Sequence, residues 1–420
     1  MPIERRLKVL REPNFRRLFL GRTTSFIGDG MAPVAIAFAV LGLGGSATDL
    51  GIVFAAHSLL LIVLVLAAGV VGDRISPRLS MLGADALCVL SMGAMAALVL
   101  SGAAEIWHLV VLYAVQGGAT AFFNPASGVI VPQIVPVRRL QEANALLELS
   151  RSLGKVVGPA LAGIMLGLGS PGSALAVDAS TFAVSALSLV GLRAPRPEAA
   201  APTSFLSELR LGWREFSARG WLVAVVCGAA ISNAIYFPAF QVLGPTVANE
   251  SLGGSGAWAA IATAMGLGAL AGGAVALSIR PRRPLLVGEG LILLIVLQVL
   301  ALAVPAPTAV IVLAALIAGG VGSLAQILFE TVWVQHVAPP VRTRVSAYDW
   351  FGSLALEPIG LALVGPVAVA IGTSQTLWLS AAAIAICLGA VYSVPSVRRL
   401  EVRVDESTPT PPPRPIEAGD

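Results

Sequence analysis

Charged side chains lie inside long apolar segments of this sequence, where a charge is costly to bury. Asp29 lies near the middle of the apolar stretch 19–43, and Arg22 precedes it by seven residues, about two helical turns. Glu357 lies in a second apolar stretch, thirteen residues beyond Arg344. An ionisable residue deep in a membrane-spanning helix costs about 2.5–3.5 kcal/mol, so it usually faces a cavity or a partner. The chemistry open to such carboxyl groups is reversible proton binding, because burial favours the neutral form and a neighbouring base favours the ionised form.

These positions predict a proton-coupled process. We expect Asp29 and Glu357 to bind and release protons during a transport cycle that is driven by inward proton flow. The competing interpretation is that both carboxylates form permanent ion pairs that hold helices together. Arg22 is expected to extend its long side chain toward the cytoplasmic interface, which the shorter side chain of Asp29 cannot reach.

Further polar and aromatic side chains occur at helical spacing in the apolar segments. One segment contains the four polar residues Ser346, Asp349, Ser353 and Glu357. Their spacing by three, four and four positions predicts one polar stripe on one helix. The predicted substrate cavity is lined by Arg22, Phe26, Gln116, Asn124, Lys155, Asn233, Tyr236, Phe237, Asp349, Trp350 and Ser353. Aromatic rings with few charges suit an amphipathic, drug-sized compound better than a sugar or a polyanion.

The elements that must position these residues are membrane-spanning helices. Hydrophobic residues make up 56% of the 420 residues and charged residues only 12%, against about 25% charged in a soluble protein. A span needs roughly 20 mostly apolar residues. Twelve such runs occur, at 16–43, 50–71, 80–101, 106–134, 147–170, 172–192, 219–243, 256–280, 283–304, 308–336, 345–371 and 374–394. The alternation expected of a membrane β-barrel is absent from the sequence.

The distribution of basic residues predicts the orientation of these spans. With twelve spans, Lys and Arg fall at the N-terminus, in the tail and in every second loop, whereas the opposite loops contain Asp49, Glu105 and Glu250. Basic loops stay in the cytoplasm, so we expect both termini and the central linker on the cytoplasmic side of the cell (inner or plasma) membrane. Asp85, Glu289 and Glu330 lie nearer that side and are expected to pair with loop arginines. The sequence pI of about 9.3 therefore requires no nucleic-acid partner.

The longest polar interruption divides the spans into six and six. The predicted organisation is an N-terminal six-helix bundle (1–192), a cytoplasmic linker (193–218), a C-terminal six-helix bundle (219–394) and a disordered cytoplasmic tail (395–420). The spacing of apolar residues from about Ser204 predicts a short helix on the membrane surface. Residues 154–163 and 356–365 echo each other, with Gly, Ala, Leu and Gly at matching positions, which is typical of transporters built from parallel repeats.

Three local patterns carry a resemblance to a known family. The segment GVVGDRISPR, residues 69–78, contains Gly69, Asp73, Arg74 and Arg78. The segment GKVVGPALAG, residues 154–163, contains Gly154, Gly158, Pro159 and Gly163. With the stretch 336–360, these segments resemble the loop signature, the antiporter signature and an exporter pattern of the major facilitator superfamily, in its branch of drug and enterobactin exporters. Ser76, Pro77 and Ala162 depart from the usual residues.

The resemblance implies an all-α integral membrane protein of twelve transmembrane helices in two pseudo-symmetric bundles. It also implies that Asp73 faces the N-terminus of the eleventh span and closes an inward gate. Within such a transporter, the antiporter-like segment favours export over uptake.

The sequence contains none of the motifs that would indicate an enzyme, a nucleotide-driven pump or a channel filter. The three cysteines lie in different spans, which argues against disulfides or a metal site, so we expect no cofactor. We predict a monomeric, proton-coupled exporter of a small amphipathic molecule: a drug, a siderophore or a metabolite. Proton-coupled uptake of a small metabolite, and a non-transporting receptor or scaffold of the same fold, are the alternatives.

Overall fold

The computed structural model describes residues 8–72, 75–192, 205–304, 306–338 and 341–401, and within these ranges the secondary structure is entirely helical. The first half contains α2 (Pro13–Gly42), α3 (Ala47–Gly72), α4 (Pro77–Ser101), α5 (Ile106–Ile134), α6 (Leu140–Leu168) and α7 (Pro171–Val190). The second half contains α9 (Gly220–Pro238), η3 (Ala239–Leu243), α10 (Gly244–Ser251), α11 (Ser255–Ala276), α12 (Pro284–Ile292), α13 (Ile295–Ala303), α14 (Thr308–His336), α15 (Arg342–Leu354), α16 (Glu357–Ile371) and α17 (Thr373–Ser393). Short helices η1 (Lys8–Arg11), η2 (Val137–Arg139), α8 (Phe205–Ser217) and α18 (Pro395–Arg398) complete the described part.

Most of these helices suit a bilayer. In the described ranges, eleven helical segments are long and apolar enough to cross a membrane. Of the twelve predicted runs, only the one that became α6 is missing from that set. This 29-residue helix packs against α2 and α11. Its mean hydropathy is lowered by four charged residues, Glu142, Glu148, Arg151 and Lys155.

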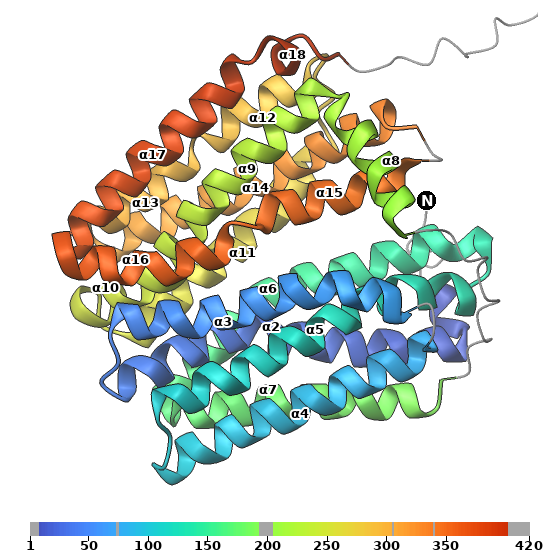
Figure 1. Cartoon of the computed structure of the whole chain (residues 1–420). Coiled ribbons are helices and arrows are strands. Elements are labelled where there is room, and N and C mark those ends of the chain that lie inside the picture. The colour runs from blue at the N-terminus through green and yellow to red at the C-terminus, as the bar shows by residue number, and fades with distance from the viewer. Residues whose placement is uncertain (1–7, 73–74, 193–204, 305, 339–340, 402–420) are drawn as a thin grey trace, which may run out of the picture.

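The helices form two bundles, as the resemblance implies (Figure 1). One bundle contains α2 to α7 and the other contains α9 to α17. The bundles touch mainly through two helix pairs, α6 with α11 and α3 with α16, with smaller contacts of α2 to η3, α10 and α11 and of α3 to η3. They meet at the end of the molecule where α10 lies and separate toward the end where α8 lies.

Glycine allows the two bundles to touch backbone to backbone. A Cβ atom on Gly365 would lie 2.3 Å from Thr48 Cα, in the first turn of α3. A Cβ atom on Gly163 would lie 2.4 Å from Ala259 Cβ, near the start of α11. Only glycine fits at such distances, so these contacts keep the halves together at one end.

Several predicted continuous helices of the second half are interrupted instead. The seventh run is interrupted by one turn of π-helix, η3, and then continues as α10 past its expected end at residue 243 to Ser251. Pro238 and Pro245 flank that turn, and proline cannot donate the regular backbone hydrogen bond. The eleventh run breaks between α15 and α16, where Pro358 has no N–H to donate to the carbonyl of Leu354, four residues earlier.

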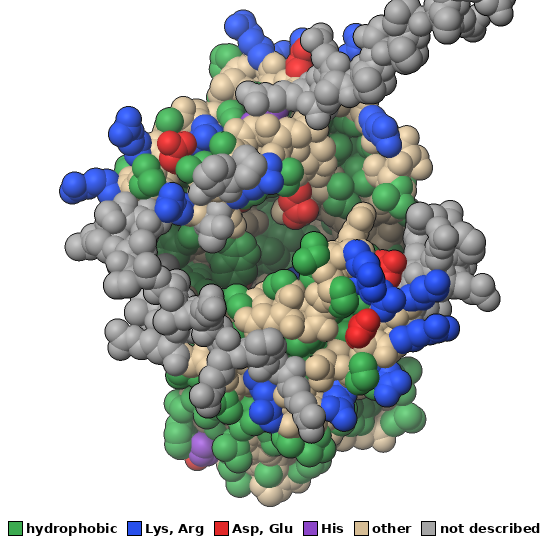
Figure 2. All heavy atoms as spheres, turned by 90° about the vertical axis from the view of Figure 1, so that its right-hand side faces the viewer, with side chains coloured by type: hydrophobic (Ala, Val, Ile, Leu, Met, Phe, Trp, Pro, Cys, Tyr) green, Lys and Arg blue, Asp and Glu red, His purple; other side chains and the backbone are tan. Residues whose placement is uncertain are grey.

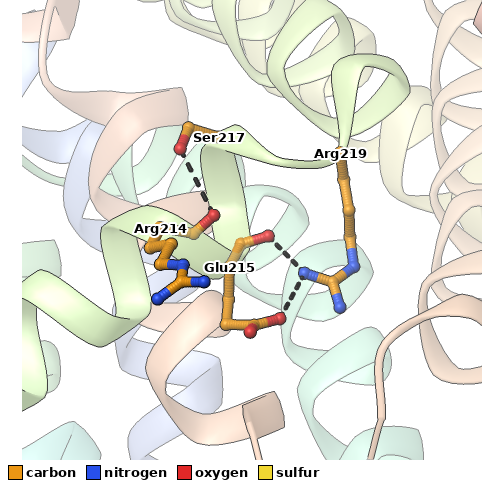
Figure 3. Close-up of polar contacts among 4 residues, drawn as sticks. All are labelled: Arg214, Glu215, Ser217 and Arg219. Carbon is orange, nitrogen blue, oxygen red and sulfur yellow. Dashed lines mark hydrogen bonds and ion pairs between the residues drawn. The ribbon is translucent and has the colours of Figure 1, made fainter.

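The short helix expected from about Ser204 is α8, and it packs against α15. The rings of Trp213 and Phe216 lie 5.7 and 6.0 Å from the ring of Tyr348. Figure 3 shows the polar contacts that join α8 to α9: Arg219 bonds to the carboxylate of Glu215 at 3.0 Å and also to its carbonyl. The helix is therefore attached to the second half. Linker residues 193–204 and tail residues 402–420 lie outside the described residues.

Candidate functional site

A cavity of about 930 Å³ lies between the two bundles. Figure 2 shows it as a hollow that opens at the end opposite α10, with Lys and Arg side chains around the opening. The predicted residues that line it in the first half are Arg22, Phe26, Asp29, Gln116, Asn124 and Lys155. From the second half, Trp350 and Glu357 line it. The structure thus brings Asp29 and Glu357, 328 positions apart in the sequence, into the wall of one cavity.

Asp29 is held in place by close helix packing on either side. A Cβ atom on Gly30 would lie 2.3 Å from the carbonyl oxygen of Gly154 in α6. A Cβ atom on Gly28 would lie 2.3 Å from Oδ1 of Asp178 in α7. Because both neighbours of Asp29 are glycines, α2 approaches α6 and α7 closely and its backbone has little room to shift.

The antiporter-like segment forms the other side of this contact. A Cβ atom on Gly158 would meet the backbone of Gly30 at 2.6 Å, and Pro159 is buried beside it. Gly154 faces the backbone of Phe26 in the same way. Gly163 instead faces α11 of the second half. Three of the four motif positions therefore belong to packing inside the first half, and one belongs to the contact between halves.

The expectation that Arg22 reaches the membrane interface is wrong. Arg22 is only 7% exposed and lines the cavity. Its guanidinium carbon lies 4.3 Å from the ring centre of Phe26 and 4.7 Å from that of Phe123. Two aromatic faces attract a cation, especially a desolvated one, so the side chain stays between the rings.

Two acidic residues differ from the sequence-based expectation: Asp85 was expected elsewhere, and Asp178 was not identified as a candidate. Asp85, expected to pair with loop arginines, is 1% exposed and lines the cavity. Asp178 is fully buried in α7, and neither of its carboxyl oxygens has a hydrogen-bond partner among the described residues. An aspartate in the middle of the apolar run 172–192 was the signal that could have revealed it.

A second pocket of about 300 Å³ lies within the second half. Four predicted cavity residues line it rather than the central cavity: Asn233, Tyr236, Asp349 and Ser353. Trp350 lines both spaces. The predicted single stripe is divided because its face of α15 borders both spaces: Ser346 and Glu357 face the central cavity, whereas Asp349 and Ser353 face the pocket.

The other predictions for the second half also need correction. Phe237 lines neither space and packs against the apolar core beside Tyr236. Glu289 lines the second pocket. Glu330 accepts a hydrogen bond from Gln326 at 3.0 Å. Within the described ranges, neither glutamate lies within 4.0 Å of a basic group, so the expected pairing with loop arginines is not found there.

The loop signature is only partly visible. Asp73 and Arg74 lie outside the described residues. Gly69 lies in α3, at a position whose surroundings are not described. Arg78 donates a hydrogen bond of 2.8 Å to the carbonyl oxygen of Leu189 and another to that of Val190. A cation at the carboxyl end of a helix is favourable, so Arg78 ties the start of α4 to the end of α7. The described residues contain no group of three or more His, Cys, Asp or Glu arranged to hold a metal.

Comparisons with known proteins agree with this architecture. The profile of the Major Facilitator Superfamily matches residues 18–356. The multidrug efflux pump Tap of Mycolicibacterium fortuitum is 31% identical over 399 residues, which cover 90% of this chain and 95% of that protein.

Solved structures share the fold at low sequence identity. The nucleoside transporter NupG superposes with a TM-score of 0.70 at 14% identity and covers 90% of this chain and 99% of its own. A bacterial homologue of the human lysosomal transporter Spinster, in an inward-facing and unoccupied conformation, superposes with a TM-score of 0.70 at 17% identity over 94% of this chain and 98% of its own. This multi-pass membrane protein belongs to the major facilitator superfamily, in the branch that contains the drug-efflux transporters.

Proposed function

We propose that this transporter exports a small amphipathic molecule across the cell membrane in exchange for protons, by alternating access. The observation that carries the proposal is the placement of Asp29 and Glu357 in one cavity, on opposite halves of the molecule. The similarity to a multidrug efflux pump supports export. A volume of about 930 Å³ suits a drug-sized compound.

The orientation of the molecule is part of the proposal. Lys and Arg surround the end at which the cavity opens, and basic segments remain in the cytoplasm. The conformation is then inward-facing, with both termini in the cytoplasm and the contact between Gly365 and Thr48 closing the outer end. Export requires that this contact separate after the substrate has entered from the cytoplasm.

The coupling we propose is competition for the cavity carboxyls. Glu357 lines the cavity together with Ser58 of α3, across the contact between the halves. An ionised Glu357 or Asp29 attracts the cationic end of a substrate, and a proton that arrives from the outside removes that attraction. Proton and substrate therefore alternate on the same groups, which is what exchange requires. We further propose that a single chain forms the complete pathway, because both carboxyls line a cavity within one chain.

Everted membrane vesicles from a strain that lacks other exporters provide the test. The expected result is accumulation of the amphipathic dye tetramethylrhodamine in energised vesicles that contain the wild-type protein, and its loss in Asp29→Asn and in Glu357→Gln. Unchanged dependence on the proton gradient in both variants would remove the proton role. Accumulation only in right-side-out vesicles would reverse the direction and make the protein an importer.

A further inference from the structure

Arg22 is a buried cation in the cavity wall, and Asp29 and Asp85 attract it only from beyond ion-pair distance. It is 7% exposed and lines the central cavity, and its contacts are with the rings of Phe26 and Phe123. Among the described residues, its guanidinium makes no hydrogen bond, and no carboxylate oxygen lies within 4.0 Å of it. A guanidinium has five N–H donors in a planar fork that matches a carboxylate, and a buried charge without a partner is costly. The cavity therefore contains an unused anion-binding group.

Two further cations lie on the same wall. Arg151 of α6 lines the cavity with its guanidinium carbon 5.3 Å from the ring centre of Phe26, and Lys155 lines it one helical turn later. The Glu148 carboxylate lies 3.8 Å from Arg151, beyond direct hydrogen-bonding distance. Lys155 has no carboxylate within 4.0 Å among the residues described. Arg22 and Arg151 thus share the ring of Phe26, and Lys155 lines the same cavity one turn along α6.

The charges on the opposite wall have the other sign. The charged residue that the second half contributes to the cavity is Glu357. On the first half, Asp29 and Asp85 share the wall with the three cations, so that side stays positive even when both carboxyls are ionised. It becomes more positive when they are neutral. The electric field in the cavity therefore runs from the first half to the second.

We propose that Arg22, Arg151 and Lys155 form a subsite for an anionic group of the substrate, a carboxylate in the simplest case. Glu357 faces the cationic end of the same molecule across the cavity. The transported compounds are then amphipathic zwitterions rather than simple lipophilic cations. This inference rests on the proposed function, because it names the substrate class of that cavity.

A pair of dyes isolates the carboxylate. Tetramethylrhodamine is a zwitterion, and its methyl ester has the same cationic ring system with the carboxylate masked. Binding of each dye to the purified full-length protein is measured by fluorescence polarisation. The acid should bind about tenfold or more tighter than the ester, because a charge-assisted hydrogen bond contributes on that scale.

Three variants assign that preference. Arg22→Met keeps an unbranched side chain between the rings but removes the charge, so it should lose the preference for the acid and keep the affinity for the ester. Arg22→Lys should retain part of the preference, because a point charge cannot form the two-pronged contact. Arg138→Met, on the exposed η2 helix outside the cavity, should bind both dyes as the wild type does.

The inference is overturned if the wild type binds neither dye or binds both equally, or if Arg22→Met weakens both dyes to the same extent. Failure of the proposed function appears separately. In that case, the wild-type protein binds the acid more tightly than the ester in detergent, but it transports neither dye in energised everted vesicles. If both dyes are transported at equal rates and Arg22→Met does not change those rates, the proposed export function stands and the proposed anion subsite is wrong.

Discussion

The two halves of this transporter have the same helix order but use it differently. In the described part of the first half, α2 to α7 are six uninterrupted helices, and they bring Arg22, Asp29, Asp85 and Lys155 to the cavity. In the second half, three predicted spans are divided, at η3, between α12 and α13, and between α15 and α16. The described residues of that half contribute one charged side chain, Glu357, to the cavity, and Asp349 and Glu289 line a separate pocket.

The difference suggests a division of labour. Uninterrupted helices joined by glycine contacts give a rigid wall, which keeps several charges at defined positions. Interrupted helices offer places where backbone angles can change, and hinges commonly lie at the ends of such elements. We infer that the first half is the binding scaffold and the second half is the part that rearranges.

The largest expected effect distinguishes the acidic residues of the second half that exchange protons during transport from those that do not. Glu357→Gln should reduce proton-driven dye accumulation by more than about tenfold, because the amide retains hydrogen bonding but cannot exchange a proton. Glu289→Gln, in the separate pocket, should change it less than about twofold, because this side chain does not line the central cavity. Initial rates in everted vesicles at matched protein amounts provide the measurement. Equal losses in the two variants would show that the pocket and the cavity act as one site.

The next effect tests the rigidity of the first half. Gly30→Ala places a methyl group 2.3 Å from a backbone oxygen of α6, which cannot move without displacing the helix. It should lower the free energy of unfolding by about 1–3 kcal/mol, the range for overpacking. Gly83→Ala, also in the first half, meets nothing within 4 Å and serves as the control. Thermal unfolding in detergent compares them; equal midpoints would mean that α2 and α6 are not rigidly packed.

The smallest effect on stability is expected for a glycine contact between the halves, in comparison with the glycine contact inside the first half. Gly365→Ala brings a methyl group within 2.3 Å of Thr48, but the halves can part to relieve the clash. The variant should therefore keep nearly wild-type thermal stability while its population shifts about fivefold, or ~1 kcal/mol, toward the outward-open form. Distances between spin labels at the starts of α3 and α17, measured in a cysteine-free background, report this shift. A large loss of stability without a longer distance would contradict the gate.

Much of the fold was predictable because membrane insertion is decided locally. Each span needs its own apolar length, and each basic loop lies between two spans, so hydropathy and the arginines predict segments and bundles without tertiary information. Asp29 and Glu357 were identifiable for the same reason, since a charge in such a segment stands out from the sequence alone.

The site itself depended on the three-dimensional arrangement. Arg22 was expected at the interface, but the rings of Phe26 and Phe123 hold it in the cavity wall, and Phe123 lies on another helix. Asp178 was missed because its importance comes from its position behind Gly28 of α2. The stripe from Ser346 to Glu357 was predicted on one face, but that face borders two spaces, and its residues divide between them.

The sequence alone determined which segments are apolar enough to enter the membrane, where the chain divides into halves and that Asp29 and Glu357 lie inside apolar segments, because each depends on the composition of a single segment. Tertiary structure alone decided which wall each of those residues occupies, which helices are interrupted and where the two halves close on each other. Those features depend on helix rotation and on backbone contacts between segments far apart in the chain, such as Gly30 with Gly154 and Gly365 with Thr48. No local pattern encodes such contacts.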